Sequence, residues 1–398
     1  MTKRLSILVL FFISTLTFGQ TNTGPANQTA GTGLTDAPGR WSAAKANAWY
    51  AKEPFLVGSN YTPANAINEL EMFQADTFDP ATIDKELATA QSIGMNTMRV
   101  FLHDLLWQQD AEGFKKRLDQ FLGICAKHNI RPMLVLFDSC WDPNPKLGKQ
   151  REPQPGIHNS GWLQSPGADA LTDVSQYPRL EAYVKGVVGA FKNDKRVLAW
   201  DTWNEPDNTN DNSYGQNHTI KTELPNARKV AIVTALLPQV FGWCRAAGAS
   251  QPLTSGVWKV FENDFSNLAK VTPMERVQIE NSDIITFHHY GPAATFEKLI
   301  QNLQQFGRPL ICTEFMARGA NSKFQTHLPI AKQYKVGMIN WGFVAGKTQT
   351  FLPWDSWQKP YVNGREPSIW FHEVYKPDGV TPIDPAEVAA IKQATGKL

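Results

Sequence analysis

The sequence predicts an α/β protein in which eight parallel strands, separated by helices, close into one barrel. Short runs of apolar residues alternate with stretches of helical periodicity along most of the chain. With 398 residues and 42% hydrophobic content, the chain can bury a barrel core as a single domain. A doubly wound open sheet is the alternative, but Gly58-Ser59-Asn60 is not the glycine-rich turn of a dinucleotide-binding sheet.

The elements follow from these patterns and from the proline and glycine residues that end them. Strands are expected at residues 55–61, 96–101, 132–137, 197–203, 252–255, 283–288, 309–313 and 337–341. Helices are expected at residues 41–52, 81–93, 114–128, 180–191, 230–247 and 296–306. The alternation favours a (β/α)8 TIM barrel with one catalytic domain over residues 41–398. Long loops over 138–177 and 207–217 are expected to wall its mouth, with a plain surface excursion as the alternative for the second loop.

The first 40 residues are predicted to lie outside the barrel. Residues 1–19 combine a basic start with an apolar run that is short for a membrane span, which is typical of a cleavable signal peptide. Residues 20–40 are mostly small and polar, so a flexible segment is expected there. We therefore expect a secreted protein, periplasmic or extracellular, that acts as a monomer and has no membrane partner after signal cleavage.

The amino-acid composition limits the classes of molecule that this protein is expected to bind. The 39 basic and 37 acidic residues nearly balance, so no nucleic-acid partner is indicated. The 13 tryptophans and 22 phenylalanines suit sugar binding, although large aromatic side chains also fill barrel cores. The cysteines lack metal-ligand spacing and are interpreted as small buried apolar residues, with any pairing left open: Cys125, Cys140, Cys244 and Cys312.

Two glutamates follow buried strands at the end of the barrel where active sites form. Glu205 comes after Trp203-Asn204, and Glu314 comes after Cys312-Thr313. A pair of opposed carboxyl groups about 5 to 5.5 Å apart suits glycoside cleavage through a covalent intermediate, and a gap of about 6.5 to 9.5 Å suits direct attack by water. A structural ion-pair role for each acid is the alternative.

These motifs resemble clan A of the glycoside hydrolases, and the chain from about Trp41 onward is most similar to family 5, the cellulase and mannanase-like barrels. The residues that carry the resemblance are Trp203-Asn204-Glu205-Pro206, Thr313-Glu314-Phe315, Arg99, His288-His289-Tyr290 and Trp341.

The resemblance implies a retaining β-glycoside hydrolase that acts on a β-linked poly- or oligosaccharide of mannan, glucan or xylan type and needs no cofactor or metal. Glu205 would be the acid/base and Glu314 the nucleophile. Arg99 and Tyr290 would lower the pKa of Glu314 and aim it. The remaining substrate contacts would come from Asn204, which binds the hydroxyl beside the reacting carbon, His288 and Trp341, the floor of the reacting subsite.

One strand departs from the family pattern. Many members end the third strand with a histidine that reaches the sugar, whereas this chain has Phe137-Asp138-Ser139-Cys140-Trp141. Asp138 and Trp141 are predicted to replace that contact, although Asp138 could equally cap a turn.

Two other functions compete. A metal-dependent barrel hydrolase would group His103, Asp138, His288 and His289 as ligands, but these residues lack tight ligand spacing. A non-catalytic carbohydrate-binding barrel would not require two opposed acids. A serine hydrolase is disfavoured because the sequence has no Gly-x-Ser-x-Gly elbow.

Overall fold

The computed structural model describes residues 33–210 and 224–397. The expected signal peptide and most of the segment 20–40 lie outside this part of the chain, as does most of the loop 207–217.

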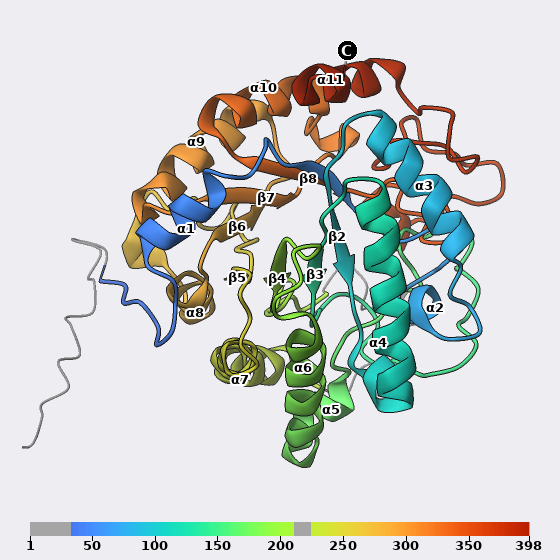
Figure 1. Cartoon of the computed structure of the whole chain (residues 1–398). Helices are drawn as coiled ribbons and strands as arrows, with labels where there is room; N and C mark the ends of the chain where they lie inside the picture. The colour runs from blue at the N-terminus through green and yellow to red at the C-terminus, as the bar shows by residue number, and fades with distance from the viewer. Residues whose placement is uncertain (1–32, 211–223, 398) are drawn as a thin grey trace, which may run out of the picture.

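Eight parallel strands form a single sheet that curls into a barrel (Figure 1). The strands are β1 (Val57–Asn60), β2 (Thr97–Phe101), β3 (Met133–Val135), β4 (Ala199–Asp201), β5 (Leu253–Thr254), β6 (Ile285–His288), β7 (Leu310–Glu314) and β8 (Gly337–Trp341). Their order in the sheet is β5-β4-β3-β2-β1-β8-β7-β6. A parallel bridge between Val257 and Phe287 joins the two ends, so the predicted (β/α)8 TIM barrel is confirmed.

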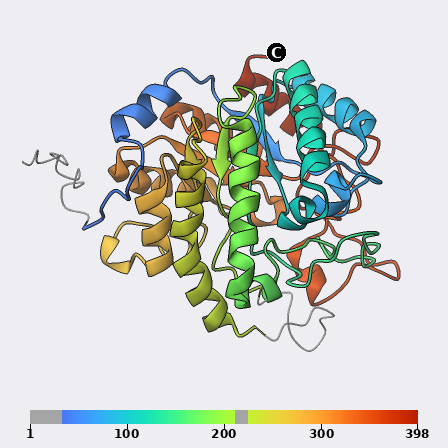
Figure 2. The ribbon, with the colours of Figure 1, turned by 60° about the horizontal axis from the view of Figure 1, so that its bottom comes forward.

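Helices surround the strands, and α4, α6 and α7 stand side by side on the outside (Figures 1 and 2). The described helices are α1 (Ala43–Tyr50), α2 (Glu69–Phe73), α3 (Pro80–Ser92), α4 (Asp104–Lys127), α5 (Ala168–Thr172), α6 (Tyr177–Phe191), α7 (Asn226–Ala246), α8 (Pro273–Asn281), α9 (Ala293–Leu303), α10 (Phe324–Tyr334) and α11 (Pro385–Thr395). The sequence prediction missed α8 and α10, which complete the alternation of strand and helix. None of the helices in the described ranges has the length and apolar character that a membrane crossing requires.

The two ends of the barrel interior differ in polarity. At the N-terminal ends of the strands, apolar side chains pack together under Trp41, which precedes α1: Leu56, Met133, Leu198, Ile284, Ile311 and Ile339. Toward the C-terminal ends the interior carries buried polar groups, and the register sets Asn60 of β1 beside Arg99 of β2. Only this polar end can position charged groups for chemistry.

The end of the segment predicted to be flexible is instead packed against the barrel. Leu34 is buried, and the backbone N–H of Thr35 donates to Glu280 at 3.0 Å. The guanidinium of Arg40 donates to the carbonyl of Ser282 at 2.7 Å. The prediction failed here because polar contacts anchor the segment, and the low apolar content of the sequence does not reveal them.

The loops after β3 and β8 lie side by side at one end of the molecule (Figure 2). The N–H of Asn159 donates to the carbonyl of Thr348 at 2.8 Å, and the N–H of Tyr361 donates to the carbonyl of Gly156 at 2.9 Å. These contacts fix the long loop 138–177 against the polar end of the barrel.

Candidate active site

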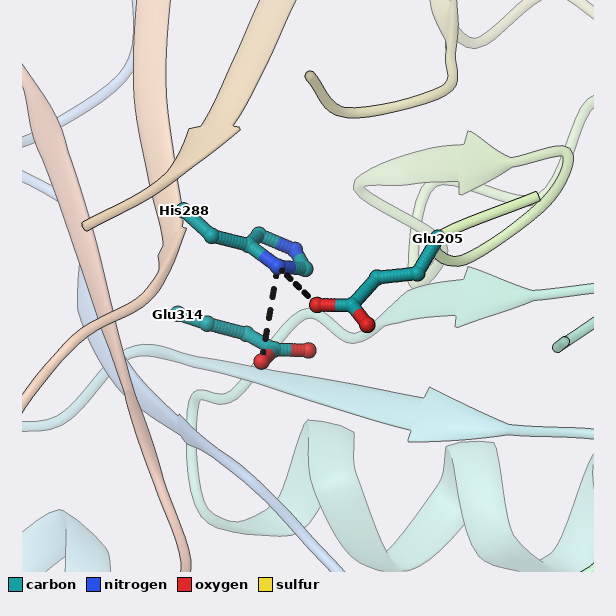
Figure 3. A group of neighbouring side chains, drawn as sticks. All are labelled: Glu205, His288 and Glu314. Carbon is teal, nitrogen blue, oxygen red and sulfur yellow. Dashed lines mark hydrogen bonds and ion pairs between the residues drawn. The ribbon is translucent and has the colours of Figure 1, made fainter. Parts of the chain in front are cut away.

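The two predicted glutamates face each other across the barrel mouth (Figure 3). Glu205 lies four residues beyond the end of β4, and Glu314 is the last residue of β7. One carboxylate oxygen of each, together with Nδ1 of His288, forms a group whose atoms all lie within 4.8 Å of one another. Glu205 has a φ of 41°, in the left-handed region that non-glycine residues seldom adopt, and such strain is often found at functional sites.

Arg99 is fully buried beneath this pair and holds one side of it. Nη1 donates to Oε1 of Glu314 and to Oδ1 of Asn60, both at 2.9 Å. Nη2 donates to Oδ1 of Asn204 at 2.7 Å and to Oδ2 of Asp201 at 2.8 Å. Burial alone would lower the pKa of the guanidinium, but Asp201 and Glu314 raise it above its ordinary value.

Glu314 therefore has a cation on one oxygen and a phenol on the other. The hydroxyl of Tyr290 donates to Oε2 of Glu314 at 2.8 Å. Arg99 and Tyr290 lower the pKa of Glu314 as predicted, but the net pKa is raised rather than lowered. Burial raises the pKa, Glu205 adds to the rise, and His288, Arg99 and Tyr290 oppose it without reversing it.

Glu205 is held by different groups. Nδ1 of His288 lies 2.8 Å from Oε1 of Glu205. The amide of Asn208 donates to Oε2 at 2.6 Å, and the thiol of Cys140 donates to the same oxygen at 3.3 Å. Burial raises the pKa of Glu205 and lowers that of His288 to about 4, so the imidazole is neutral at neutral pH. The nearest hydrogen-bond partners of Glu205 are thus uncharged, whereas Glu314 has the guanidinium of Arg99 on one of its oxygens.

A cleft of about 760 Å³ opens above the two carboxylates. Glu205, Glu314, Asn204, His288 and Tyr290 all line it, and so do four tryptophans: Trp141, Trp258, Trp341 and Trp354. The ring of Trp141 stacks on that of Trp357 at 5.3 Å, and the ring of Trp341 meets Phe101 edge-on at 5.8 Å. Aromatic faces beside a pair of acids suit a ligand with an apolar face and hydroxyl groups.

Asp138 does not line this cleft, so its predicted contact with the sugar is corrected. Its side chain is buried behind Asn204, whose amide donates to Oδ1 at 2.9 Å, and Nε1 of Trp162 donates to Oδ2 at 2.6 Å. The backbone N–H of Cys140 also donates to Oδ1 at 2.9 Å, which is the local turn contact that we gave as the alternative. The role of Asp138 is therefore to orient Asn204.

The four residues grouped under the competing metal-dependent function do not come together as ligands in the part of the chain that the structure describes. In the described ranges, the side chains spaced for a metal ion are Glu205, His288 and Glu314 rather than that set. His103 does not contribute to that group, because its Nδ1 accepts a hydrogen bond from the backbone N–H of Leu105 at 3.1 Å. His289 lines the cleft but packs against Phe296 with ring centroids 5.4 Å apart.

Three site residues were missed by the sequence prediction. Asp201 precedes the Asn-Glu pair by three residues and is hidden in an apolar run, although a lone acid in a buried strand is itself a signal. Asn208 lay within the loop that was expected only to wall the cleft. Cys140 is buried and forms no disulfide, like the other three cysteines, but it is more than the apolar residue that the sequence predicts, because its sulfur contacts Glu205.

The fold and the opposed acids define a TIM barrel with a two-carboxylate cleft. The family model described as Cellulase (glycosyl hydrolase family 5) matches residues 58–359, about three quarters of the chain. The chain belongs to glycosyl hydrolase family 5, as predicted, and is an O-glycosyl hydrolase. No curated protein matches the sequence.

Solved structures of mannan-degrading enzymes resemble this one in fold. The exo-β-1,4-mannosidase Op5Man5 from Opitutaceae bacterium strain TAV5 is 18% identical with a TM-score of 0.55; the match covers 86% of this chain but only 59% of that one. The endo-1,4-β-mannanase from Rhizomucor miehei is 12% identical, with a TM-score of 0.53 and coverage of 87% and 96%. The endo-β-1,4-mannanase from Thermotoga petrophila is 13% identical, with a TM-score of 0.54 and coverage of 87% and 77%.

Replacing Arg99 by Met tests whether its charge holds this site together. The change leaves Asp201 and Glu314 buried without a cation, so we expect the free energy of unfolding to fall by about 3–5 kcal/mol. Denaturant unfolding measures this, with Arg228→Met as the control. Arg228 is exposed on α7, so the control is expected to change stability by less than about 0.5 kcal/mol. An Arg99→Met protein as stable as the control would contradict the interpretation.

Proposed function

We propose that this protein is a secreted, monomeric, retaining β-glycoside hydrolase that cleaves a β-linked poly- or oligosaccharide by double displacement. The observation that carries the proposal is the closeness of the two acids: one carboxylate oxygen of each belongs to a group of three atoms, with one from His288, that all lie within 4.8 Å of one another. Retaining enzymes place their carboxyl groups about 5–5.5 Å apart, whereas inverting enzymes leave about 6.5–9.5 Å for a water molecule.

In the first step, Glu314 attacks the anomeric carbon while Glu205 protonates the departing glycosidic oxygen. Arg99 and Tyr290 each donate to one oxygen of Glu314, which orients the carboxylate and offsets part of its desolvation. Bond formation at carbon and bond cleavage to oxygen leave a covalent glycosyl-enzyme and a neutral leaving group.

In the second step, water enters from the side that the leaving group has vacated. Glu205, now ionised, removes a proton from this water, and the oxygen attacks the anomeric carbon and releases Glu314. Two inversions give net retention. His288 stays neutral beside both acids, so it can hydrogen-bond to Glu205 in either protonation state.

Asn204 supports the reacting sugar. Its Oδ1 accepts from Arg99 and its Nδ2 donates to Asp138, which fixes the orientation of the amide in the cleft wall. Its second amide hydrogen makes only the long 3.6 Å contact with the sulfur of Cys140, so this hydrogen can turn to the hydroxyl beside the reacting carbon, and that bond strengthens in the transition state. Trp341 provides the floor of the same subsite.

Glu314→Gln and Glu205→Gln test the two roles. Glu314→Gln is expected to lower kcat/KM by at least ~10³-fold on every substrate, because the nucleophile is lost. Glu205→Gln should lose ~10²–10⁴-fold on oligosaccharides but much less on the glycosylation of an activated aryl glycoside, whose leaving group needs little protonation. Glu112→Gln on the exposed face of α4 is the control. Full turnover by Glu314→Gln would refute the nucleophile.

The pH profile of kcat/KM is expected to be bell-shaped. The acidic limb follows ionisation of Glu314 and the alkaline limb follows loss of the proton from Glu205. Because burial raises both pKa values, both limbs are expected above the ordinary glutamate value of about 4.3. A pH–rate profile measures this, and Glu205→Gln should lose the alkaline limb. An acidic limb below the ordinary value would contradict the effect of burial.

The substrate class is the finer part of the proposal. Mannan, glucan and xylan suit the cleft chemically, and the mannan-degrading enzymes among the structural neighbours favour β-mannosides as the first choice. We expect the purified protein to release product most rapidly from mannan or manno-oligosaccharides. Assays on mannan, mixed-linkage glucan, xylan and short oligosaccharides, with product lengths recorded, check this. A preference for glucan or xylan would overturn the choice of sugar without affecting the mechanism.

A further inference from the structure

The sulfur of Cys140 occupies an unusual position for a buried thiol, since it lines the cleft and touches the proposed proton donor. It also accepts from two amides, Nδ2 of Asn208 at 3.4 Å and Nδ2 of Asn204 at 3.6 Å. With these amides donating to the sulfur, the thiol hydrogen is left for Oε2 of Glu205. Cys140 therefore links the group that positions the sugar to the group that protonates the leaving oxygen.

We propose that Cys140 is a positioning residue for the acid/base: its S–H donates to Oε2 of Glu205 and, together with Asn208, fixes the carboxyl in the orientation needed for proton transfer. The inference rests on the proposed role of Glu205. The two donors reach one oxygen from two loops, Cys140 after β3 and Asn208 after β4. Nδ1 of His288 lies at the other oxygen, so the carboxyl group is held at both ends.

The two loops are tied together directly behind the carboxyl group. The ammonium of Lys229 on α7 donates to the carbonyl of Ser139 at 2.9 Å and to that of Asn208 at 2.7 Å. The hydroxyl of Ser139 donates to the carbonyl of Pro206 at 2.8 Å. A thiol beside a fixed backbone has little freedom to turn away, so its contact with Glu205 is built into the fold.

The thiol is suited to donate rather than to react. Burial, with Asp138, Glu205 and Glu314 adding to it, raises the Cys140 pKa well above its usual value, so the sulfur keeps its hydrogen. Its donation favours ionised Glu205, and loss of the thiol should raise the pKa of that carboxyl. Within residues 33–210 and 224–397, the charged or titratable groups that act on Glu205 are Arg99, Asp138, Asp207, Lys229, His288, Tyr290 and Glu314.

Cys140→Ala and Cys140→Ser test the proposal on the full-length enzyme. For Cys140→Ala we expect kcat/KM on a β-linked oligosaccharide to fall about tenfold, and that on an activated aryl glycoside to change less than about threefold. The alkaline limb of its pH profile should move to higher pH. Cys140→Ser retains a donor and should recover most of the loss. Cys244→Ala, which removes a buried thiol from α7, should leave both substrates and the pH profile unchanged.

Two results for Cys140→Ala would overturn the proposal. In the first, the ratio of oligosaccharide to aryl-glycoside activity and the alkaline limb of the pH profile both stay as in the wild type. In the second, both activities fall by the same factor, which indicates a structural role. If Cys140→Ala does not fold, infrared spectra of the wild type and of Glu205→Gln test whether the thiol of Cys140 donates to Glu205. The S–H band assigned to Cys140 should shift when its acceptor is changed, and a band that does not move refutes the contact. If the wild type cleaves no β-glycoside, the proposed function fails, while the infrared result still reports on the contact.

Discussion

The guanidinium of Arg99 is the interaction on which the polar end of the barrel depends. It lies fully buried in β2 and donates to side chains from three other strands or strand ends, which are Asn60, Asp201, Asn204 and Glu314. A buried cation requires anions around it, and two buried carboxylates require a cation. Each member of the network therefore stabilises the charge of the others, and together they set the distance between the strands that carry the chemistry.

This network also makes the two acids unequal. Burial acts on both carboxyl groups in the same direction, but only Glu314 has the guanidinium on one of its oxygens. Glu205 is surrounded by an imidazole, an amide and a thiol, which are neutral donors. The proposed double displacement requires one ionised and one protonated carboxyl group, and this difference in partners is the feature of the site that favours such a division.

The repeating features of the sequence were sufficient to predict the barrel, its strands and the two acids, because buried strands and the residues at their ends have strong local patterns. Elements without such patterns were missed: α10 contains Pro329 in its interior, and α8 is short. Contacts between distant segments were also out of reach. The thiol of Cys140, the position of Asp138 behind Asn204 and the raised pKa of Glu314 depend on loop packing and burial, which single-residue patterns do not encode.

The anomeric configuration of the first product tests the central claim, that the two opposed carboxyl groups act by double displacement. Proton NMR during the first minutes of hydrolysis of a β-linked substrate shows which anomer is released before mutarotation. The account predicts that the β anomer appears first and the α anomer accumulates only as the two equilibrate. Initial release of the α anomer would show inversion and would contradict the covalent intermediate on Glu314.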